Sequence, residues 1–266
     1  MRLLTALALM ATPALAQERI PSHCIAVAAA DPTVIPVALE DGLEQDSVLI
    51  RYLDHASFAI VTADGTVAVT DYTGYLGTQD LVPDVVTMNN AHHTHWTDYP
   101  DPRIPHVLTG WAERGVAPEY RLDLGAMLVR NVTTDTRGPF GEGARKDGNS
   151  IFIFEAAGLC IGHLGHLHQI PSEEQYAAIG RLDVVMVPVD GGYTMRLQDM
   201  AGVVRRLRSS VVIPMHWFSN ESLQAFLRQM SDGFTVVETG GAQIALSLRD
   251  LPSEPTIIVL EPAWLD

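Results

Sequence analysis

Histidines gather directly after segments that have the pattern of buried strands. Three apolar runs each lead into such residues: His93 and His95 follow residues 84–88, His163, His166 and His168 follow residues 159–161, and His216 follows residues 211–215. Neutral imidazole is a common ligand of transition metals, and two histidines at i and i+2 of an extended loop point the same general way. Because successive strand ends meet at one rim of an α/β sheet, this spacing predicts a metal site there.

The elements that must hold these side chains change in type along the chain. The first part is rich in hairpins, with predicted strands at 48–54, 57–62, 66–70, 84–88, 151–154 and 159–161. The second part alternates, with predicted helices at 172–180, 197–208 and 221–230 and predicted strands at 183–189, 210–215, 235–238 and 243–248. Residues 172–175 (Ser-Glu-Glu-Gln) have the pattern of a capping box that opens the first helix. No linker-like tract divides the two parts, so we predict one domain, residues 17–266, with two mixed sheets face to face and helices outside. The proline-containing tail, residues 251–266, is predicted to wrap the surface.

Residues 1–16 have the pattern of a secretory signal peptide. Arg2 precedes an apolar run too short to span a bilayer, and Ala14-Leu15-Ala16 forms a small-x-small cleavage site before Gln17. No other stretch is long and apolar enough to be transmembrane. We therefore expect an exported protein, periplasmic or secreted, with no membrane association after cleavage.

The chain is acidic, with 32 Asp and Glu against 17 Lys and Arg and a formal charge of −15. The dense basic cluster at Arg205–Arg208 lies on a predicted helix and is typical of a solvated face. Nucleic acid is therefore a poor candidate partner. The two cysteines, Cys24 and Cys160, could form a disulfide in an oxidising compartment, but Cys160 lies in an apolar run where a buried free thiol is equally natural.

Six segments in order resemble the metallo-β-lactamase fold superfamily, in the branch similar to the ascorbate-phosphate lactonase-like hydrolases. They are residues 54–58 (Asp-His-Ala-Ser-Phe), 71–72 (Asp-Tyr), 93–95 (His-Thr-His), 163–167 (His-Leu-Gly-His-Leu), 187–194 (Val-Pro-Val-Asp-Gly-Gly-Tyr-Thr) and 213–216 (Ile-Pro-Met-His). The resemblance implies an α/β fold, a four-layer αββα sandwich of two mixed sheets, with a metal site at its rim.

The departures from the family pattern bear on the number of ions. Where the superfamily loop reads His-x-His-x-Asp-His, Thr97 stands in the Asp slot and Asp98 in the last His slot, and residues 133–136 lack the next ligand histidine. His166 stands where the family has a metal-bridging Asp. A carboxylate can offer an oxygen to each of two metals, whereas neutral imidazole has one free lone pair. We therefore expect one ion rather than two.

The resemblance, residue by residue, implies a metal site of His93, His95 and His166 on one side of the ion and His216 and Asp98 on the other. Three histidines and a water form a catalytic zinc arrangement, in which zinc lowers the pKa of the bound water to about 7. Asp98 is then expected to act as general base or to orient a ligand histidine, and His216 is grouped with it as catalytic. If His216 or Asp98 also binds, the alternatives are a closed, structural site or a site for another metal such as iron or manganese.

Four further residues are predicted to contact a small-molecule substrate: His55, Trp96, Tyr193 and Trp217. The alternative for the aromatic side chains, and for Tyr99, is packing in the core. His163 could be a ligand or a packed residue, and His168 could line the mouth of the site or face water.

These features predict an exported, mononuclear zinc hydrolase acting on an ester, lactone or phosphoester. Two alternatives stay open: a non-catalytic periplasmic protein that binds a metal or small ligand, and an iron-dependent redox enzyme of the same fold. Resistance to β-lactam drugs is less favoured, because ligands of the family pattern are missing.

Overall fold

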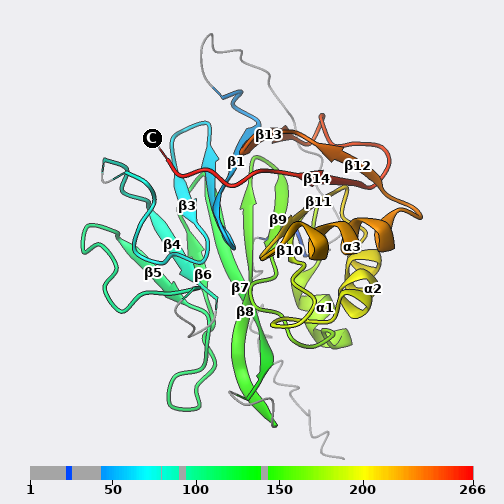
Figure 1. Ribbon diagram of the computed structural model, residues 1–266. Coiled ribbons are helices and arrows are strands. Elements are labelled where there is room, and N and C mark those ends of the chain that lie inside the picture. The colour runs from blue at the N-terminus through cyan, green and yellow to red at the C-terminus, as the bar shows by residue number, and fades with distance from the viewer. Residues whose placement is uncertain (1–21, 26–42, 79, 90–93, 139–142, 266) are drawn as a thin grey trace, which may run out of the picture.

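The computed structural model describes residues 22–25, 43–78, 80–89, 94–138 and 143–265. The predicted signal segment and His93 lie outside these ranges. The described chain forms two sheets that pack face to face (Figure 1). One is six-stranded, in the order β13 (Gln243–Ser247), β1 (Ser47–Asp54), β2 (Ser57–Thr62), β3 (Val67–Val69), β4 (Val85–Met88) and β5 (His106–Thr109).

The second sheet is eight-stranded and mixed. Its order is β12 (Thr235–Glu238), β14 (Thr256–Val259), β11 (Val211–Met215), β10 (Val184–Pro188), β9 (Leu159–His163), β8 (Ala144–Ala156), β7 (Met127–Arg137) and β6 (Arg121–Asp123). The strands from β12 to β9 run parallel, whereas β9 to β6 pair antiparallel. Parallel strands that are buried on both faces are expected to be continuously apolar, and β10 and β11 are buried at every position.

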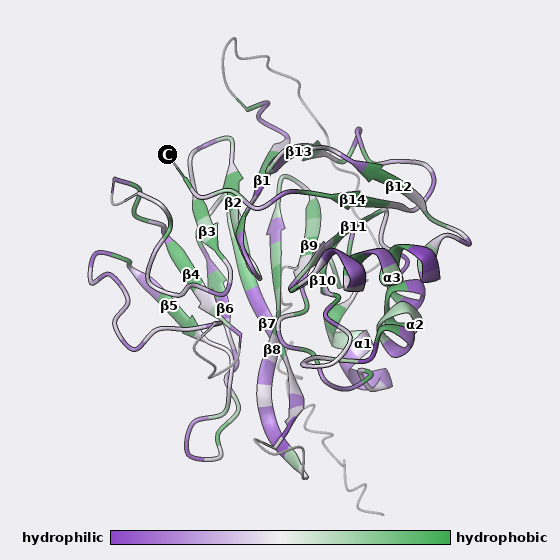
Figure 2. Cartoon of the chain, viewed as in Figure 1, coloured by the Kyte–Doolittle hydropathy of each residue, from purple (hydrophilic) through white to green (hydrophobic). Residues whose placement is uncertain are grey.

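Three helices lie within the described residues: α1 (Glu173–Ile179), α2 (Leu197–Leu207) and α3 (Asn220–Met230). The predicted capping box is present at α1, where the Ser172 hydroxyl accepts from the N–H of Gln175 and the Gln175 side chain accepts from the N–H of Ser172. Gly180 ends α1 with a φ of +74°, a conformation that favours glycine. All three helices lie beside β9, β10 and β11, and α2 and α3 carry hydrophilic residues while the strands are largely apolar (Figures 1 and 2).

The interior is divided into three apolar clusters. The largest lies between the sheets, where side chains such as Phe58 and Ile60 meet Phe152 and Phe154. A second cluster joins the outer face of the eight-stranded sheet to the three helices. A third lies on the six-stranded sheet and includes residues of the segments that follow β3 and β4, such as Leu76, rather than of any described helix. The structure thus confirms the α/β sandwich of two mixed sheets, with the described helical layer on one side.

The C-terminal segment differs from the prediction. Residues 251–266 were expected to wrap the surface, but Thr256–Val259 forms β14, which is buried and pairs in parallel with both β11 and β12. Three of its four residues are β-branched aliphatic and the fourth is threonine, a composition that favours strands. The flanking prolines end the strand instead of excluding it.

Strand β7 was not predicted, and its hairpin partner β8 is longer than the sequence indicated. Strand β8 begins at Ala144, whereas only its apolar end, residues 151–154, was predicted. The first four residues of β8 are exposed or only partly buried, so the hydrophobic pattern that marks a strand is absent there. No helix in the described part of the chain is both long and apolar enough to cross a membrane.

Candidate metal centre

Three histidines from distant parts of the chain meet at one rim of the sandwich. His55 lies in the turn between β1 and β2, His95 in the segment after β4, and His216 directly after β11. One ring nitrogen of each lies within 4.8 Å of the other two. His95 and His216 are almost fully buried, at 0% and 1% exposure. The ring of His166, which follows β9, is 4.8 Å from that of His95 and 5.2 Å from that of His216.

Asp71 orients His95. Its Oδ2 lies 2.6 Å from Nδ1 of His95, and its Oδ1 accepts the backbone N–H of Asn89 at 2.8 Å. A carboxylate that accepts from Nδ1 leaves the lone pair of a neutral ring on Nε2. Burial raises the pKa of Asp71 to about 7, while His163, the Asn89 N–H and His216 act to lower it. A positive charge at the centre would favour the ionised carboxylate.

Asp190 is the corresponding carboxylate for His216. Its Oδ2 lies 3.1 Å from Nδ1 of His216, an ion-pair distance without the angle of an aligned hydrogen bond. Oδ1 accepts the backbone N–H groups of Gly192, Tyr193 and Thr194, and Oδ2 accepts the Thr194 hydroxyl at 2.5 Å. Burial alone would raise the pKa of Asp190, but these hydrogen bonds and His216 outweigh burial and hold it well below its ordinary value.

The geometry between the two oriented rings fits a bound cation. Nε2 of His95 and Nε2 of His216 are 3.1 Å apart. With both Nδ1 atoms directed at carboxylates, two Nε2 lone pairs face each other, and this arrangement requires a proton or a metal ion between them. Around a tetrahedral ion with metal–nitrogen bonds of about 2.0–2.1 Å, two ligand nitrogens lie roughly 3.3 Å apart. The residues present therefore fit a metal ion.

The backbone at the centre is held in an unfavourable region. His55, Asp71 and His216 have φ values of +46°, +44° and +60°, in the left-handed region that non-glycine residues seldom occupy. Such residues cost of the order of 1–3 kcal/mol each and persist where their surroundings fix them. Here the carbonyl of His55 accepts the N–H of His216 at 2.8 Å and the hydroxyl of Tyr52 at 2.7 Å. The strain therefore coincides with the residues that could hold a ligand.

The other predicted metal residues are placed differently. His93 lies outside the described residues. Asp98 is exposed, and the described contacts of the histidine cluster do not include it. The carboxylates that do reach the cluster are Asp71 and Asp190. Each of these carboxylates orients a histidine that is distant in the sequence. Both lie in segments that resemble the family, but the resemblance did not indicate which histidine each one orients.

Hydrogen bonds hold His163 within the fold and join His168 to its neighbours. His163 is fully buried, with Nε2 donating to the carbonyl of Ala56 at 2.7 Å and Nδ1 accepting from the Asn89 side chain at 2.9 Å. Both nitrogens are used within the fold, so His163 is a packed residue. His168 contacts His166 and the backbone of Arg137 instead of facing water alone.

The predicted aromatic residues divide between the core and the mouth of the centre. Trp217 packs edge-on against Tyr52, and Trp96 packs against Trp111, so both lie in apolar clusters. Tyr193 is 69% exposed, and its ring lies 5.2 Å from that of Phe218.

Phe218 was not predicted. Its ring lies 5.3 Å from the rings of both His55 and His216. It is 63% exposed, so with Tyr193 it forms an aromatic wall at the accessible side of the cluster. The one signal in the sequence was its position two residues after His216.

A cavity of about 330 Å³ lies away from the histidines. Its lining comes from residues 72–83 and 99–104 and includes Tyr75, Tyr99 and the Asp101–Arg103 ion pair. None of the cluster histidines lines it, and Tyr99 belongs to this cavity rather than to the centre.

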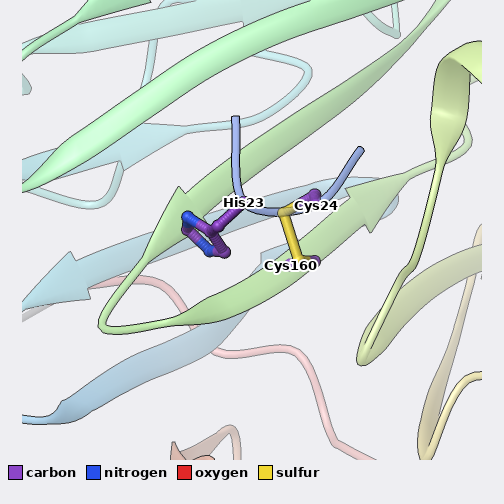
Figure 3. A group of neighbouring side chains, drawn as sticks. All are labelled: His23, Cys24 and Cys160. Atoms are coloured by element: carbon purple, nitrogen blue, oxygen red, sulfur yellow. A yellow bond between two sulfur atoms is a disulfide. The ribbon is translucent and has the colours of Figure 1, made fainter. Parts of the chain in front are cut away.

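A second group of potential ligands lies at the other end of the fold. His23, Cys24 and Cys160 are close enough to surround an ion, but Cys24 and Cys160 are joined by a disulfide (Figure 3). Disulfide sulfurs are not thiolates and do not bind metal as cysteine does. The disulfide decides between the two possibilities left open for these cysteines.

Comparisons with known proteins agree with this geometry. A family model described as a beta-lactamase superfamily domain matches residues 49–216. A UPF0173 metal-dependent hydrolase of Symbiobacterium thermophilum is 27% identical over 220 residues, covering 73% of this chain and 94% of the relative. A solved structure from Thermotoga maritima, assigned as a Zn-dependent hydrolase of the metallo-β-lactamase superfamily, has a TM-score of 0.58 and 25% identity over 81% of this chain and 99% of its own. Igni18, a metallo hydrolase from Ignicoccus hospitalis, shares the fold with a TM-score of 0.56 at 17% identity, over 76% of this chain and 99% of its own.

The relatives that the chain matches are metal-dependent hydrolases, and the two-sheet sandwich with its carboxylate-oriented histidines agrees with that class. With the family match spanning more than half of its length, the chain belongs to the beta-lactamase superfamily. The resemblance read from the six sequence segments is thereby confirmed at the level of the superfamily.

Proposed function

We propose that this chain is an exported hydrolase that binds one zinc ion and cleaves an ester, lactone or phosphoester of a small molecule. The observation that carries the proposal is the pair of Nε2 atoms of His95 and His216, 3.1 Å apart and each backed by a carboxylate. A histidine oriented by a carboxylate is the usual form of a metal ligand.

The carboxylates support a single ion. Both oxygens of Asp71 are engaged, one by His95 and one by the N–H of Asn89. Both oxygens of Asp190 are engaged by its own loop and face His216. Each carboxylate directs an oxygen at the Nδ1 of a histidine, so the described part of the centre presents imidazole nitrogens to the ion. Three imidazoles with an open position suit catalytic zinc.

The residues of the centre have the following proposed roles. His95, His216 and His55 hold the ion, and Asp71 and Asp190 fix the rings of the first two. When bound, the ion supplies a water of lowered pKa and neutralises charge on the substrate oxygen. Phe218 and Tyr193 form an apolar edge that the organic part of a substrate can contact. The orienting role expected of Asp98 falls to Asp71 and Asp190, and Asp98 stays the proposed proton acceptor.

Export is supported by two features. Residues 1–16 have the pattern of a signal peptide, and the described chain contains a disulfide between Cys24 and Cys160. Disulfides persist in oxidising compartments such as the bacterial periplasm and are rare in the cytosol.

The test is elemental analysis of the protein purified without added metal, followed by reconstitution with zinc. We expect one zinc per chain and hydrolysis of at least one of three probes: a nitrophenyl acetate, a simple lactone and bis(nitrophenyl) phosphate. Two ions per chain would contradict the mononuclear centre. Iron, with oxygen consumption, would favour the redox alternative. A protein that binds zinc but cleaves none of the probes would favour the binding protein.

A further inference from the structure

Two exposed aromatic side chains form a pair at the accessible side of the histidine cluster. The rings of Tyr193 and Phe218 meet edge to face at 5.2 Å, and the two residues are 69% and 63% exposed. Hydrophobic residues exposed singly are common on protein surfaces and do not indicate a site. Here, however, the Phe218 ring also lies 5.3 Å from the rings of His55 and His216. The exposed pair is therefore continuous with the side chains that are proposed to hold the ion.

Tyr193 lies in a loop whose backbone is held from two directions. Its N–H donates to Oδ1 of Asp190 at 2.5 Å, and its carbonyl accepts from Nη2 of Arg137 at 2.7 Å. The same two side chains bind both sequence neighbours of Tyr193, because Asp190 accepts their N–H groups and Arg137 donates to their carbonyls. The loop that orients His216 through Asp190 therefore also positions the Tyr193 ring.

Phe218 is held through its neighbours on both sides in the sequence. Before it, Trp217 packs edge-on against Tyr52, with 5.4 Å between the rings. After it, helix α3 begins at Asn220, with Ser219 as its N-cap. Binding loses less affinity to ordering when the contact surface is already fixed in the free protein. The short anchored segment that carries Phe218 is such a surface.

We propose that Phe218 and Tyr193 determine the specificity of the centre, by selecting substrates in which an aromatic ring or another flat apolar group adjoins the bond that is cleaved. The inference rests on the proposed hydrolysis and adds the substrate class to it. A ring that packs on Phe218 buries apolar surface of both partners and gains the contacts that aromatic pairs favour. Because Phe218 contacts the ring of His216, a group bound there lies next to the reacting bond and not at a distant subsite.

A second exposed aromatic pair provides a matched control. The rings of Tyr75 and Trp264 are 5.4 Å apart, and the two residues are 55% and 38% exposed. Tyr75 lines the cavity of about 330 Å³, whose described lining includes no histidine of the cluster. The two pairs thus present similar aromatic surfaces, but only the pair at Phe218 adjoins the histidines. Loss of the ring at Phe218 should change substrate choice, whereas loss of the ring at Tyr75 should not.

The first test compares methyl phenylacetate with methyl acetate, which differ by one phenyl ring, as substrates of the zinc-loaded protein. Hydrolysis is followed with a pH indicator, and the measured quantity is the ratio of the two kcat/KM values, in which differences in zinc content between variants cancel. Phe218→Ala should lower this ratio about 10-fold, the size expected for the loss of one buried aromatic contact, and Tyr193→Ala should lower it about threefold. Phe218→Tyr, which keeps the ring, and Tyr75→Ala should keep the native ratio. An unchanged ratio in Phe218→Ala would overturn the inference.

The second test measures binding and needs no turnover. Two uncharged ketones that cannot be hydrolysed, 4-phenylbutan-2-one and butan-2-one, are titrated into the protein with and without zinc, and their Kd values are measured by ligand-observed NMR. The native protein and Tyr75→Ala should bind the phenyl ketone at least about 10-fold more tightly than butan-2-one, and Phe218→Ala should lose most of this preference. Equal affinity of the native protein for both ketones would overturn the inference, even if esters are hydrolysed.

The two tests separate the inference from the function on which it rests. If the phenyl ketone binds as expected but the protein holds no zinc and cleaves no ester, the proposed function fails while the aromatic binding surface stands. Gel filtration of the native protein and Phe218→Ala distinguishes a further role of the pair. If Phe218→Ala converts a dimer into a monomer and leaves the substrate ratio and the ketone preference unchanged, the pair is an interface between two copies of the chain, and the inference is overturned.

Discussion

Two clusters of potential ligands lie in this fold, and they differ in chemistry more than in geometry. Around His55, His95 and His216 each imidazole donor atom is close to the others, and carboxylates direct two lone pairs inward. Around His23 the donor atoms are equally close, but both sulfurs are used in the disulfide.

The carboxylates of the two clusters also differ in their partners. Glu155, next to His23, is engaged by Arg130 at 2.7 Å and by the Ser22 hydroxyl at 2.6 Å. Its charge is therefore already balanced within the fold, whereas those of Asp71 and Asp190 are directed at imidazoles. The comparison teaches that proximity marks a candidate site, and that protonation and oxidation states decide whether it binds a metal.

The largest expected difference between the clusters is in zinc binding. His216→Ala should weaken zinc binding by more than about 100-fold, beyond the loss typical of an outer orienting residue, and abolish zinc-dependent hydrolysis. His23→Ala is the matched control from the other cluster and should leave both unchanged. The measurement is zinc content after gel filtration, together with competition against a chelator. Loss of zinc in His23→Ala would indicate that the metal binds next to the disulfide instead of at the histidine cluster.

The next effect is on stability and concerns the disulfide cluster. The bond joins residues 136 apart in the sequence, so its removal frees a long loop in the unfolded chain. Cys24→Ser and Cys160→Ser should each lower the free energy of unfolding by about 2–5 kcal/mol, measured by urea denaturation. Zinc stoichiometry should stay at the native value. A variant that lost zinc while remaining folded would show that the two clusters are coupled.

The smallest expected effect is the pH dependence of the metal-free protein. Burial lowers the pKa of His163 and lowers that of His168 to about 4, so both are neutral in the folded state. The unfolded chain takes up these protons near pH 6.5, so stability is fully present above that pH and is lost as the pH falls toward 4.

The expected slope is up to about 1.4 kcal/mol per pH unit for the fully buried His163. Urea denaturation at pH 7, 6, 5 and 4 measures it, and a His163→Gln variant should show a shallower slope. Asp71, whose pKa burial raises to about 7, contributes in the opposite direction over this range, so the test is the difference between the two slopes. Equal slopes in the native protein and in His163→Gln would contradict the burial of a neutral His163.

Much of the centre was predictable because strand ends are visible in the sequence. His95 and His216 follow apolar runs and were predicted to bind the metal, whereas His55, in a segment that resembles the family, was predicted to contact the substrate. The partners of these histidines were not predictable. Asp71 reaches His95 across 24 residues, and such pairing depends on which strands become neighbours.

The secondary structure shows the same difference between local signals, which were predictable, and long-range pairing, which was not. The capping box at Ser172 predicted the start of α1, because the capping interaction is local. Strand β14 was missed because its assignment depends on the neighbours β11 and β12, while the local sequence contains prolines. Loops that cover the six-stranded sheet, including Leu76 and Trp96, carry no periodicity that would mark them as a layer.

The position of β14 has a consequence for the order in which the strands can pair while the chain is being synthesised. β11, which leads into His216, lies between β10 and β14, so its pairing is unfinished until residue 259 has been synthesised. Pairing of strands far apart in sequence is slow, and here it involves the last strand of the chain. In a nascent chain, the sheet that carries His216 is therefore completed only after β14 has been made.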